Sequence, residues 1–411
     1  MEHDVNTVNK MIVGRGYLYR NKLRRVWRNH LHVLQFLKRG KFRRALNLLY
    51  TIYLVPGGEG AMQVAYRLGL SKVMTRWPQL APVPRNIEIE VTTVCDKKCV
   101  FCEHTHWEKG SQDIRHLKFD EFKHIVDQLP NVRWVNLTGE GSAFLNKDYF
   151  RMLRYLREKY ETSIYLVDHL SDLTKEELDE LIDIVDGIYV SIDGATKETY
   201  EKIKVGCSFA NVLNNLKYII QRKKELKQYK PDLNIRYVVV KDNLHEAPVF
   251  IDLINSIATK KDIDVGMINF TGLLFFDRIK QWYVDKYPQE LVEELRKRTK
   301  KGIPFRLEHC VDELNPPPHK CYAWMEPYIM MGGHVLPCCS VLMSNNRPFL
   351  RKYAFGNVFE QDFKEIWNSE RYRTFRKTIT NPDKPVPILC AGCRGFNTKP
   401  RIEKYGVAKH I

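Results

Sequence analysis

The chain has 411 residues, of which 44% are hydrophobic and 28% are charged, and its formal net charge is +17. This length exceeds one ordinary hydrophobic core, so two or three domains are expected, and the apolar content excludes a disordered chain. The start, "MEHDVNTVNK", lacks a signal-peptide pattern, and the longest apolar run, Ala45–Val55, is too short to cross a bilayer. We therefore expect a cytoplasmic protein.

The N-terminal region carries more than half of the excess positive charge, with 12 Lys and Arg against two acids between Met1 and Arg44. Apolar residues recur at helical spacing from Leu23 to Leu37. Basic residues surround them, namely Arg24, Arg25, Arg28 and Lys38. The pattern fits a helix packed on the body with a solvated basic face, a helix lying on an anionic membrane surface, or an RNA-binding segment.

After a proline-rich linker at Trp77–Asn86, strands alternate with helices. Six strands are expected, at residues 86–94, 132–137, 163–167, 187–192, 233–240 and 262–270. Helices are expected between them, at residues 118–129, 147–160, 174–185, 208–226 and 247–257. This order predicts parallel strands joined by right-handed crossovers, hence an open or closed α/β barrel with its site at the carboxyl ends of the strands.

Three cysteines follow the first expected strand directly, in "TTVCDKKCVFCEHTHW". Cys95, Cys99 and Cys102 put three thiolates on one loop without a fourth cysteine, which suits a four-iron cluster with one open iron. His104 and His106 are near enough to keep a zinc site as an alternative.

The spacing Cys-x3-Cys-x2-Cys, with Phe101 before the last cysteine, resembles the radical S-adenosylmethionine (radical SAM) superfamily. The resemblance implies a partial (β/α)6 TIM-like barrel and a 4Fe-4S cluster whose open iron chelates SAM. In that family, reduction of SAM gives a 5′-deoxyadenosyl radical that abstracts a hydrogen from the substrate, while the protein holds and aims the cofactor. A flavodoxin- or ferredoxin-like electron donor is therefore implied.

Two further segments match family motifs at strand ends. "NLTGEGSAFLN" resembles the family's GGE motif, which implies that Gly139 and Glu140 receive the SAM amino group, with Thr138 replacing the first glycine. "VSIDGATKETYEKIK" resembles a SAM-contacting segment, and this implies roles for Ser191 and Asp193. Turn formation is the simpler explanation for each motif taken alone.

After the third strand the sequence departs from the family. Relatives often carry Thr-Asn-Gly there, whereas this chain has Asp168 and His169 at the first two positions. A carboxylate and an imidazole at the mouth of the barrel could bind substrate or move a proton. The simpler alternative is that Asp168 caps a turn.

The C-terminal quarter contains a second cysteine set. "FGNVFEQDFKEIWNSERYRTFR" resembles a stretch of SPASM and twitch domains, which bind auxiliary iron–sulfur clusters. The resemblance implies one auxiliary 4Fe-4S cluster on Cys321, Cys338, Cys390 and Cys393. Cys339 competes with Cys338, and a structural zinc site is the alternative for the same thiolates. Cys207 and Cys310 are expected to be buried thiols.

The expected domains are a basic helical extension at 1–84, the barrel at 85–305 and the auxiliary-cluster domain at 306–411. A fully ligated auxiliary cluster fits a role in relaying an electron during oxidation or C–C bond formation. The basic N-terminal region favours a lipid or lipid-linked sugar as substrate, with possible attachment to a membrane surface. Peptide maturation is the alternative substrate class, and a non-catalytic electron carrier or zinc scaffold is the alternative of another kind.

Overall fold

The computed structural model describes residues 27, 29–53, 81, 83–107, 110, 113–258, 265–273, 277–285, 287–299, 302–308, 317–344, 346–393 and 395–409. They form two compact units. The first contains Cys95–Glu108 and Tyr165–Leu314. The second contains Lys22–Val94, Lys109–Ile164 and Asn315–Ile411.

The first unit is built on parallel strands in the order β3-β4-β5-β6-β7. Their bounds are Ser163–Asp168 for β3, Gly187–Ser191 for β4, Asp232–Val239 for β5, Val265–Gly272 for β6 and Phe305–Glu308 for β7. Apolar side chains of the central strands, such as Ile188, Val190 and Ile235, are fully buried. Burial on both faces is typical of parallel strands that are covered by helices.

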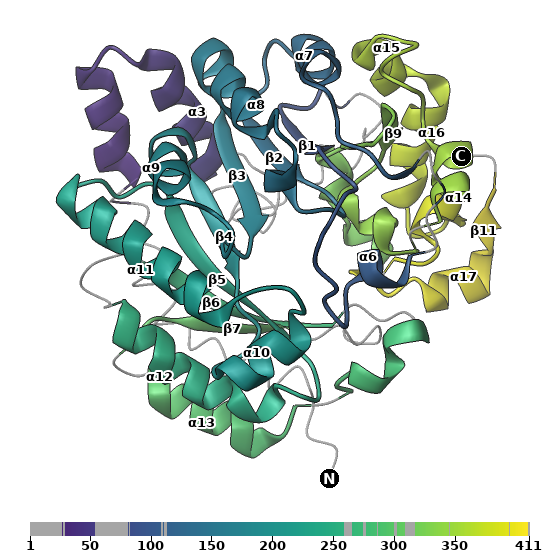
Figure 1. Cartoon of the computed structure of the whole chain (residues 1–411). Helices are drawn as coiled ribbons and strands as arrows, with labels where there is room; N and C mark the ends of the chain where they lie inside the picture. The colour runs from purple at the N-terminus through teal and green to yellow at the C-terminus, as the bar shows by residue number, and fades with distance from the viewer. Residues whose placement is uncertain are drawn as a thin grey trace. The chain divides into compact units, whose positions relative to one another are not determined.

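Helices of the first unit lie along the outside of its strands (Figure 1). They are α9 (Lys175–Ile184), α11 (Phe209–Glu225), α12 (Ala247–Ile257) and α13 (Gln289–Thr299). The short helix α10 (Lys197–Ile203) follows β4, and its Ile203 packs with Val240 and Leu273, which follow β5 and β6. The start of α9 shows why the chain turns into a helix there. Thr174 Oγ1 accepts a hydrogen bond from Glu177 N at 3.3 Å, and Thr174 N donates to Glu177 Oε2 at 2.8 Å, so two orphan donors are satisfied together.

The second unit contains strands in the order β2-β1-β8-β9. Parallel pairs join β1 (Asn86–Glu90) to β2 (Trp134–Thr138) and to β8 (Tyr328–Met330), and β8 forms an antiparallel hairpin with β9 (His334–Leu336). Its helices include α3 (Phe42–Tyr53), α7 (Phe119–Asp127), α8 (Tyr149–Tyr155), α14 (Arg347–Tyr353), α15 (Phe363–Asn368), α16 (Glu370–Ile379) and α17 (Lys399–Tyr405). A small two-stranded sheet pairs β10 (Val386–Pro387) with β11 (Val407–Ala408).

The expected α/β architecture with six parallel strands is confirmed. The structure differs from the prediction in the length of the first strand and in a further strand after the sixth. The first strand ends at Glu90, four residues early, because Thr92 leaves the ladder and forms an isolated bridge with His116. Strand β7 was not predicted. No helix among the described residues is long and apolar enough to span a bilayer.

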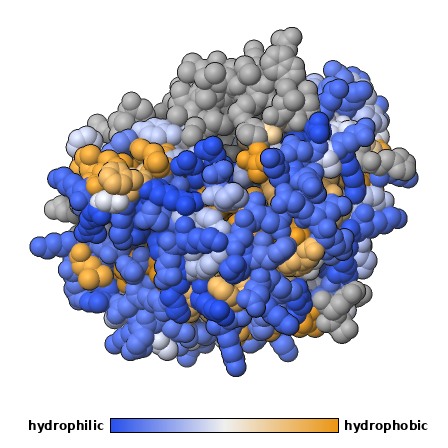
Figure 2. Space-filling view, turned by 90° about the horizontal axis from the view of Figure 1, so that it is seen from above, coloured by the Kyte–Doolittle hydropathy of each residue, from blue (hydrophilic) through white to orange (hydrophobic). Residues whose placement is uncertain are grey.

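The N-terminal helical region does not match the first of its three expected roles, a helix whose apolar stripe packs on the body. Leu23, Arg24, Arg25 and Arg28 lie outside the described residues. The rest of the stripe is exposed, with Trp27 at 69%, Leu31 at 37%, Leu34 at 52% and Leu37 at 40%. Val33 and Phe36 are buried instead, against Ala45, Leu48 and Ile52. Hydrophobic surface gathers at the edge where Figure 1 shows α3 (Figure 2).

Candidate functional site

The cysteines of the first motif lie on the loop that leads into the short helix α6 (Glu103–His106), and all three are half-buried. The loop folds back on itself at Cys99, whose carbonyl oxygen accepts from Cys102 N at 3.1 Å and from Thr105 Oγ1 at 2.9 Å. His106 Nε2 lies 2.7 Å from Val100 O and donates to it, so this nitrogen is not available to a zinc ion.

Residues after α10 hold the same loop from the other side. Lys98 N donates to Val205 O at 2.9 Å, and Val100 N donates to Ile203 O at 3.0 Å. The Cys207 thiol, buried as expected, hydrogen-bonds Cys99 and lowers the pKa of the Cys99 thiol below its ordinary value. Since metal ligands are thiolates, this contact favours the ligand form of Cys99.

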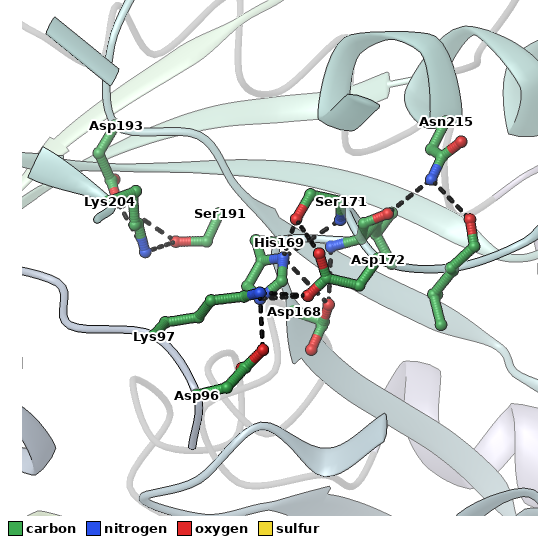
Figure 3. A network of polar contacts seen from close by, with 12 residues as sticks. Asp96, Lys97, Asp168, His169, Ser171, Asp172, Ser191, Asp193, Lys204 and Asn215 are labelled. Atoms are coloured by element: carbon green, nitrogen blue, oxygen red, sulfur yellow. Dashed lines mark hydrogen bonds and ion pairs between the residues drawn. The ribbon is translucent and has the colours of Figure 1, made fainter. Parts of the chain in front are cut away.

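Two buried lysines lie beside this loop and were missed by the sequence analysis (Figure 3). Lys97 Nζ is 2.9 Å from Asp96 Oδ2 and 2.8 Å from Asp172 Oδ2, and these carboxylates raise the pKa of Lys97 against the effect of burial. Lys204 Nζ is 2.9 Å from Asp193 Oδ2, and the charges of Asp193 and Cys99 raise its pKa against the effect of burial. Both lysines stay charged and favour thiolates in the loop.

Ser191 and Asp193 end β4 and begin the following loop, and both are buried. Lys204 Nζ donates to Ser191 Oγ at 3.0 Å and lies 5.5 Å from the centre of the Phe101 ring. The second Asp193 oxygen, Oδ1, accepts from Val238 N at 2.6 Å. Both carboxylate oxygens of Asp193 are thus engaged within the protein, so its direct contact with SAM stays a prediction.

Gly139 and Glu140 belong to the second unit, in the turn after β2. A Cβ at Gly139 would lie 2.7 Å from Thr92 O and 2.9 Å from Glu90 Cγ, so glycine is required by close backbone approach. Ser142 N donates to Val94 O at 2.9 Å. The turn therefore lies against the residues that immediately precede Cys95 in the chain.

A buried ion pair supports this turn and was also missed. Arg347 Nη1 and Nη2 donate to the two Glu90 oxygens at 2.7 and 2.8 Å, and the side chains are 1% and 0% exposed. Glu90 also accepts from Met331 N at 2.8 Å and from Glu140 N at 3.4 Å. Burial opposes the charge on Arg347, but Glu90 raises the pKa of the guanidinium above its ordinary value. The pair is bidentate and charged.

Asp168 is the last residue of β3, and His169 begins the tight turn that follows it (Figure 3). Asp168 Oδ1 accepts from Leu170 N at 2.6 Å, and Leu170 has a left-handed φ of 62°. Asn215 Nδ2 holds the turn through Leu170 O at 2.7 Å. Asp168 therefore does cap a turn. His169 Nδ1 accepts from Ser171 N at 3.1 Å, and Nε2, which has no hydrogen-bond partner among the described residues, is 3.9 Å from Asp172 Oδ2.

The four C-terminal thiols share one neighbourhood in the second unit. Burial and the charge of Cys393 raise the pKa of the Cys321 thiol to about 12. Burial raises the pKa of Cys338 together with Cys321 and Cys393, and that of Cys390 together with all three other thiols. Four adjacent thiols have the donor chemistry that a 4Fe-4S cluster needs. Cys338 is buried among them, whereas Cys339 is exposed and hydrogen-bonds Glu88.

Within the described residues, no three His, Cys, Asp or Glu side chains converge closely enough to hold a single metal ion. Cys310 lies outside the described residues, so its predicted burial stays untested.

Residues 89–254 match the family model of the radical SAM superfamily, and residues 321–394 match the model of the SPASM iron–sulfur cluster-binding domain. A tungsten-containing aldehyde ferredoxin oxidoreductase cofactor-modifying protein of Pyrococcus furiosus is 24% identical over 314 residues, which are 74% of this chain and 86% of that protein.

Solved structures share the fold. SuiB of Streptococcus suis bound to S-adenosylmethionine matches with a TM-score of 0.56 at 16% identity, over 87% of this chain and 81% of SuiB. Native anSMEcpe with bound AdoMet and Cp18Cys peptide matches with a TM-score of 0.52 at 16% identity, over 76% and 88%. SAM, a 4Fe-4S cluster and an auxiliary iron–sulfur cluster are thus its cofactors. With its cysteine loop, its glycine turn and its C-terminal thiols in place, the chain belongs to the radical SAM superfamily and carries a C-terminal SPASM domain.

Proposed function

We propose that this radical SAM enzyme abstracts a hydrogen atom from a peptide and oxidises or cross-links it. Cys321, Cys338, Cys390 and Cys393 would hold an auxiliary cluster that could take up the electron released by the substrate radical. The observation that carries this proposal is the presence of two separate thiol sets, one on a loop with three cysteines and one with four. When bound and reduced, SAM supplies the 5′-deoxyadenosyl radical. Enzymes of this class need a reductant, and we infer a flavodoxin- or ferredoxin-like donor. A non-catalytic carrier would not need the SAM-binding turn at Gly139 and Glu140.

A peptide is preferred to the lipid or lipid-linked sugar that the sequence favoured. None of the relatives named above is described as acting on a lipid. SuiB has been solved with its precursor peptide SuiA, with a TM-score of 0.54 to this chain, and anSMEcpe has been solved with a peptide. These likenesses lend support to a peptide substrate, while the basic N-terminal region remains the only support for a lipid.

We infer two roles for side chains near the cysteine loop: two lysines stabilise the negative charge of the thiolates, and His169 orients the substrate. Lys97 and Lys204 place positive charge beside the cluster thiolates. His169 Nδ1 accepts a backbone N–H, so the neutral ring carries its proton on Nε2. This Nε2–H donates to a polar group of the bound substrate at the carboxyl end of β3. Asp168 acts as a positioning residue, because its carboxylate fixes the turn that carries the imidazole.

Replacing His169 tests this function, with peptides encoded beside the gene as candidate substrates. In His169→Leu we expect product per 5′-deoxyadenosine to fall by about 10²-fold, because the substrate is no longer oriented, while SAM cleavage by dithionite continues. His169→Gln keeps an N–H donor and should recover part of the loss. The measurement is mass spectrometry of peptide and 5′-deoxyadenosine, including deuterium transferred from labelled peptide.

Two results would count against these assignments. Equal loss of SAM cleavage and product in His169→Leu would indicate a merely structural role for the imidazole. Failure to transfer deuterium from any neighbouring peptide, with lipid-linked sugars acting instead, would return the substrate to the lipid class.

We further infer that the N-terminal helix can hold the enzyme at a membrane surface. The exposed side chains of Trp27, Leu31, Leu34 and Leu37 adjoin a basic segment. Each basic residue near an anionic surface contributes about 1 kcal/mol.

Flotation should therefore show binding to phosphatidylserine vesicles that falls with added salt and drops sharply after changing Arg24, Arg25 and Arg28 to Gln. Neutral vesicles and a Lys202→Gln/Lys297→Gln variant, changed at exposed lysines elsewhere, are the controls. If the protein did not float with anionic vesicles at low salt, this helix would have no role in membrane binding, and its apolar stripe would simply face solvent.

A further inference from the structure

Polar side chains occupy one face of β1, a strand whose residues are all buried. Asn86, Glu88 and Glu90 alternate along it and therefore point to the same side. Glu88 is paired in register with Asn136 of β2 and with Tyr328 of β8, so these three side chains form a row across neighbouring strands. Such a row is unusual for a strand covered on both faces.

The two acids of β1, Glu88 and Glu90, differ in whether a basic side chain balances their negative charge. Glu90 has a full countercharge in Arg347. Glu88 accepts hydrogen bonds from Asn136 and from the Cys339 thiol, and Glu326 is hydrogen-bonded by Asn86, but neither acid has a basic partner among the described residues. Burial raises the pKa of Glu88 to about 7, and burial together with the charge of Glu88 raises that of Glu326. Ionised carboxylates are costly to bury without a cation, and a bound cation would favour the ionised form of both acids.

Several polar atoms of this row, and of the adjoining Asn86 and Glu326 side chains, are also without hydrogen-bond partners within the described residues. They are Glu88 Oε2, Glu326 Oε1, Asn86 Oδ1, Asn136 Oδ1 and Tyr328 Oη. Asn86, Glu88 and Tyr328 are at most 7% exposed, so solvent does not satisfy these atoms at the surface. Because more than nine in ten buried polar groups are normally paired, five together point to a ligand rich in donors.

An exposed neighbour of the row, Cys339, connects it to solvent. Cys339 is exposed, yet its thiol donates to Glu88. Cys339 is bonded to Cys338 in the chain, which places the row beside the proposed auxiliary-cluster ligands.

We propose that Glu88, Glu326, Asn86, Asn136 and Tyr328, named here the Glu88 cluster, bind an ammonium or guanidinium group of the substrate. This inference rests on the proposed function, since it gives the substrate a basic group. Carboxylate oxygens accept the N–H donors of such a cation and share its charge. A neutral hydroxyl group would satisfy hydrogen bonds but would gain no attraction to the ionised form of the two acids. The described residues offer no three-ligand set for a metal ion.

Calorimetry with butylguanidinium tests the proposal, with uncharged butylurea as the matched probe and holoenzyme containing both clusters and SAM as the receptor. We expect butylguanidinium to bind at least about tenfold more tightly than butylurea, which corresponds to about 1.4 kcal/mol. Glu88→Gln/Glu326→Gln should remove this preference. Glu290→Gln, at an exposed site, should keep it. The double variant should fold, because it removes buried charge, and its iron content and visible spectrum serve as checks.

Alkylation of Cys339 by iodoacetamide gives a second measurement, read by peptide mass spectrometry. Butylguanidinium, but not butylurea, should slow this alkylation in the wild-type holoenzyme, and the protection should disappear in the double variant. The proposal is overturned if butylurea binds equally well, if the double variant keeps the preference, or if calorimetry detects no binding of the cation. None of these measurements needs a peptide or turnover, so failure of the proposed function would appear separately as absent deuterium transfer.

Discussion

Changing Cys95, Cys99 and Cys102 together to Ala is expected to halve the iron content and to abolish reductive cleavage of SAM. Two four-iron clusters correspond to about eight iron atoms per chain, so the variant should retain about four. SAM cleavage should stop because its open-iron cluster is lost. Iron analysis and chromatography of 5′-deoxyadenosine after dithionite reduction are the measurements.

Cys390→Ala is the matched control, because it alters the other thiol set. We expect this variant to lose iron and part of the visible absorption but to keep making 5′-deoxyadenosine. Retention of one zinc per chain, with no iron lost on the substitution, would instead indicate a structural zinc site at Cys321, Cys338, Cys390 and Cys393. Continued 5′-deoxyadenosine formation by the triple variant would refute the assignment of the first loop.

Local patterns explain why the order of elements and the cysteine sets could be predicted. Alternating apolar residues and helical periodicity depend on neighbours within a few positions, and cluster cysteines are recognised by their spacing. Lys97 was not found because a lysine among cysteines has many possible partners, and its partner Asp172 lies 75 positions further along the chain. Arg347 lies 257 positions from Glu90, a separation that no local pattern encodes.

One signal could have led to the polar face of β1. The sequence "NIEIE" alternates polar and apolar residues, and a half-exposed strand is the usual explanation for such alternation. The structure buries all five residues. Acids at Glu88 and Glu90 in a buried strand require partners, so the alternation is also compatible with a polar interior.

For the N-terminal helix, periodicity predicted the helix but not which of its faces is buried. Its periodicity gave an apolar stripe, yet the structure buries Val33 and Phe36 and leaves Leu31 and Leu34 exposed. A helix with apolar residues around much of its circumference does not determine which face packs.

Breaking the buried ion pair of Glu90 and Arg347 is expected to lower both the stability of the protein and its affinity for SAM. Arg347→Met removes a guanidinium that is 1% exposed and leaves the Glu90 carboxylate without a countercharge. Breaking such a pair from one side lowers the free energy of unfolding by about 3–5 kcal/mol. Because Glu90 also accepts from Glu140 N, we expect the affinity for SAM to fall as well. Urea denaturation under anaerobic conditions and equilibrium binding of SAM measure the two effects.

Two further variants separate the charge effect from loss of packing. Glu90→Gln/Arg347→Met removes both charges, so it should be more stable than Arg347→Met alone, since replacing a whole buried pair is often close to neutral. Lys352→Met removes an exposed cation from the same helix without leaving a buried carboxylate unpaired, so it should cost at most about 1 kcal/mol. If Arg347→Met and the double variant were equally unstable, the packing of the long arginine side chain would be the stabilising feature. If Arg347→Met left both stability and SAM binding unchanged, the pair would have no role in stabilising the protein or in holding the Gly139–Glu140 turn.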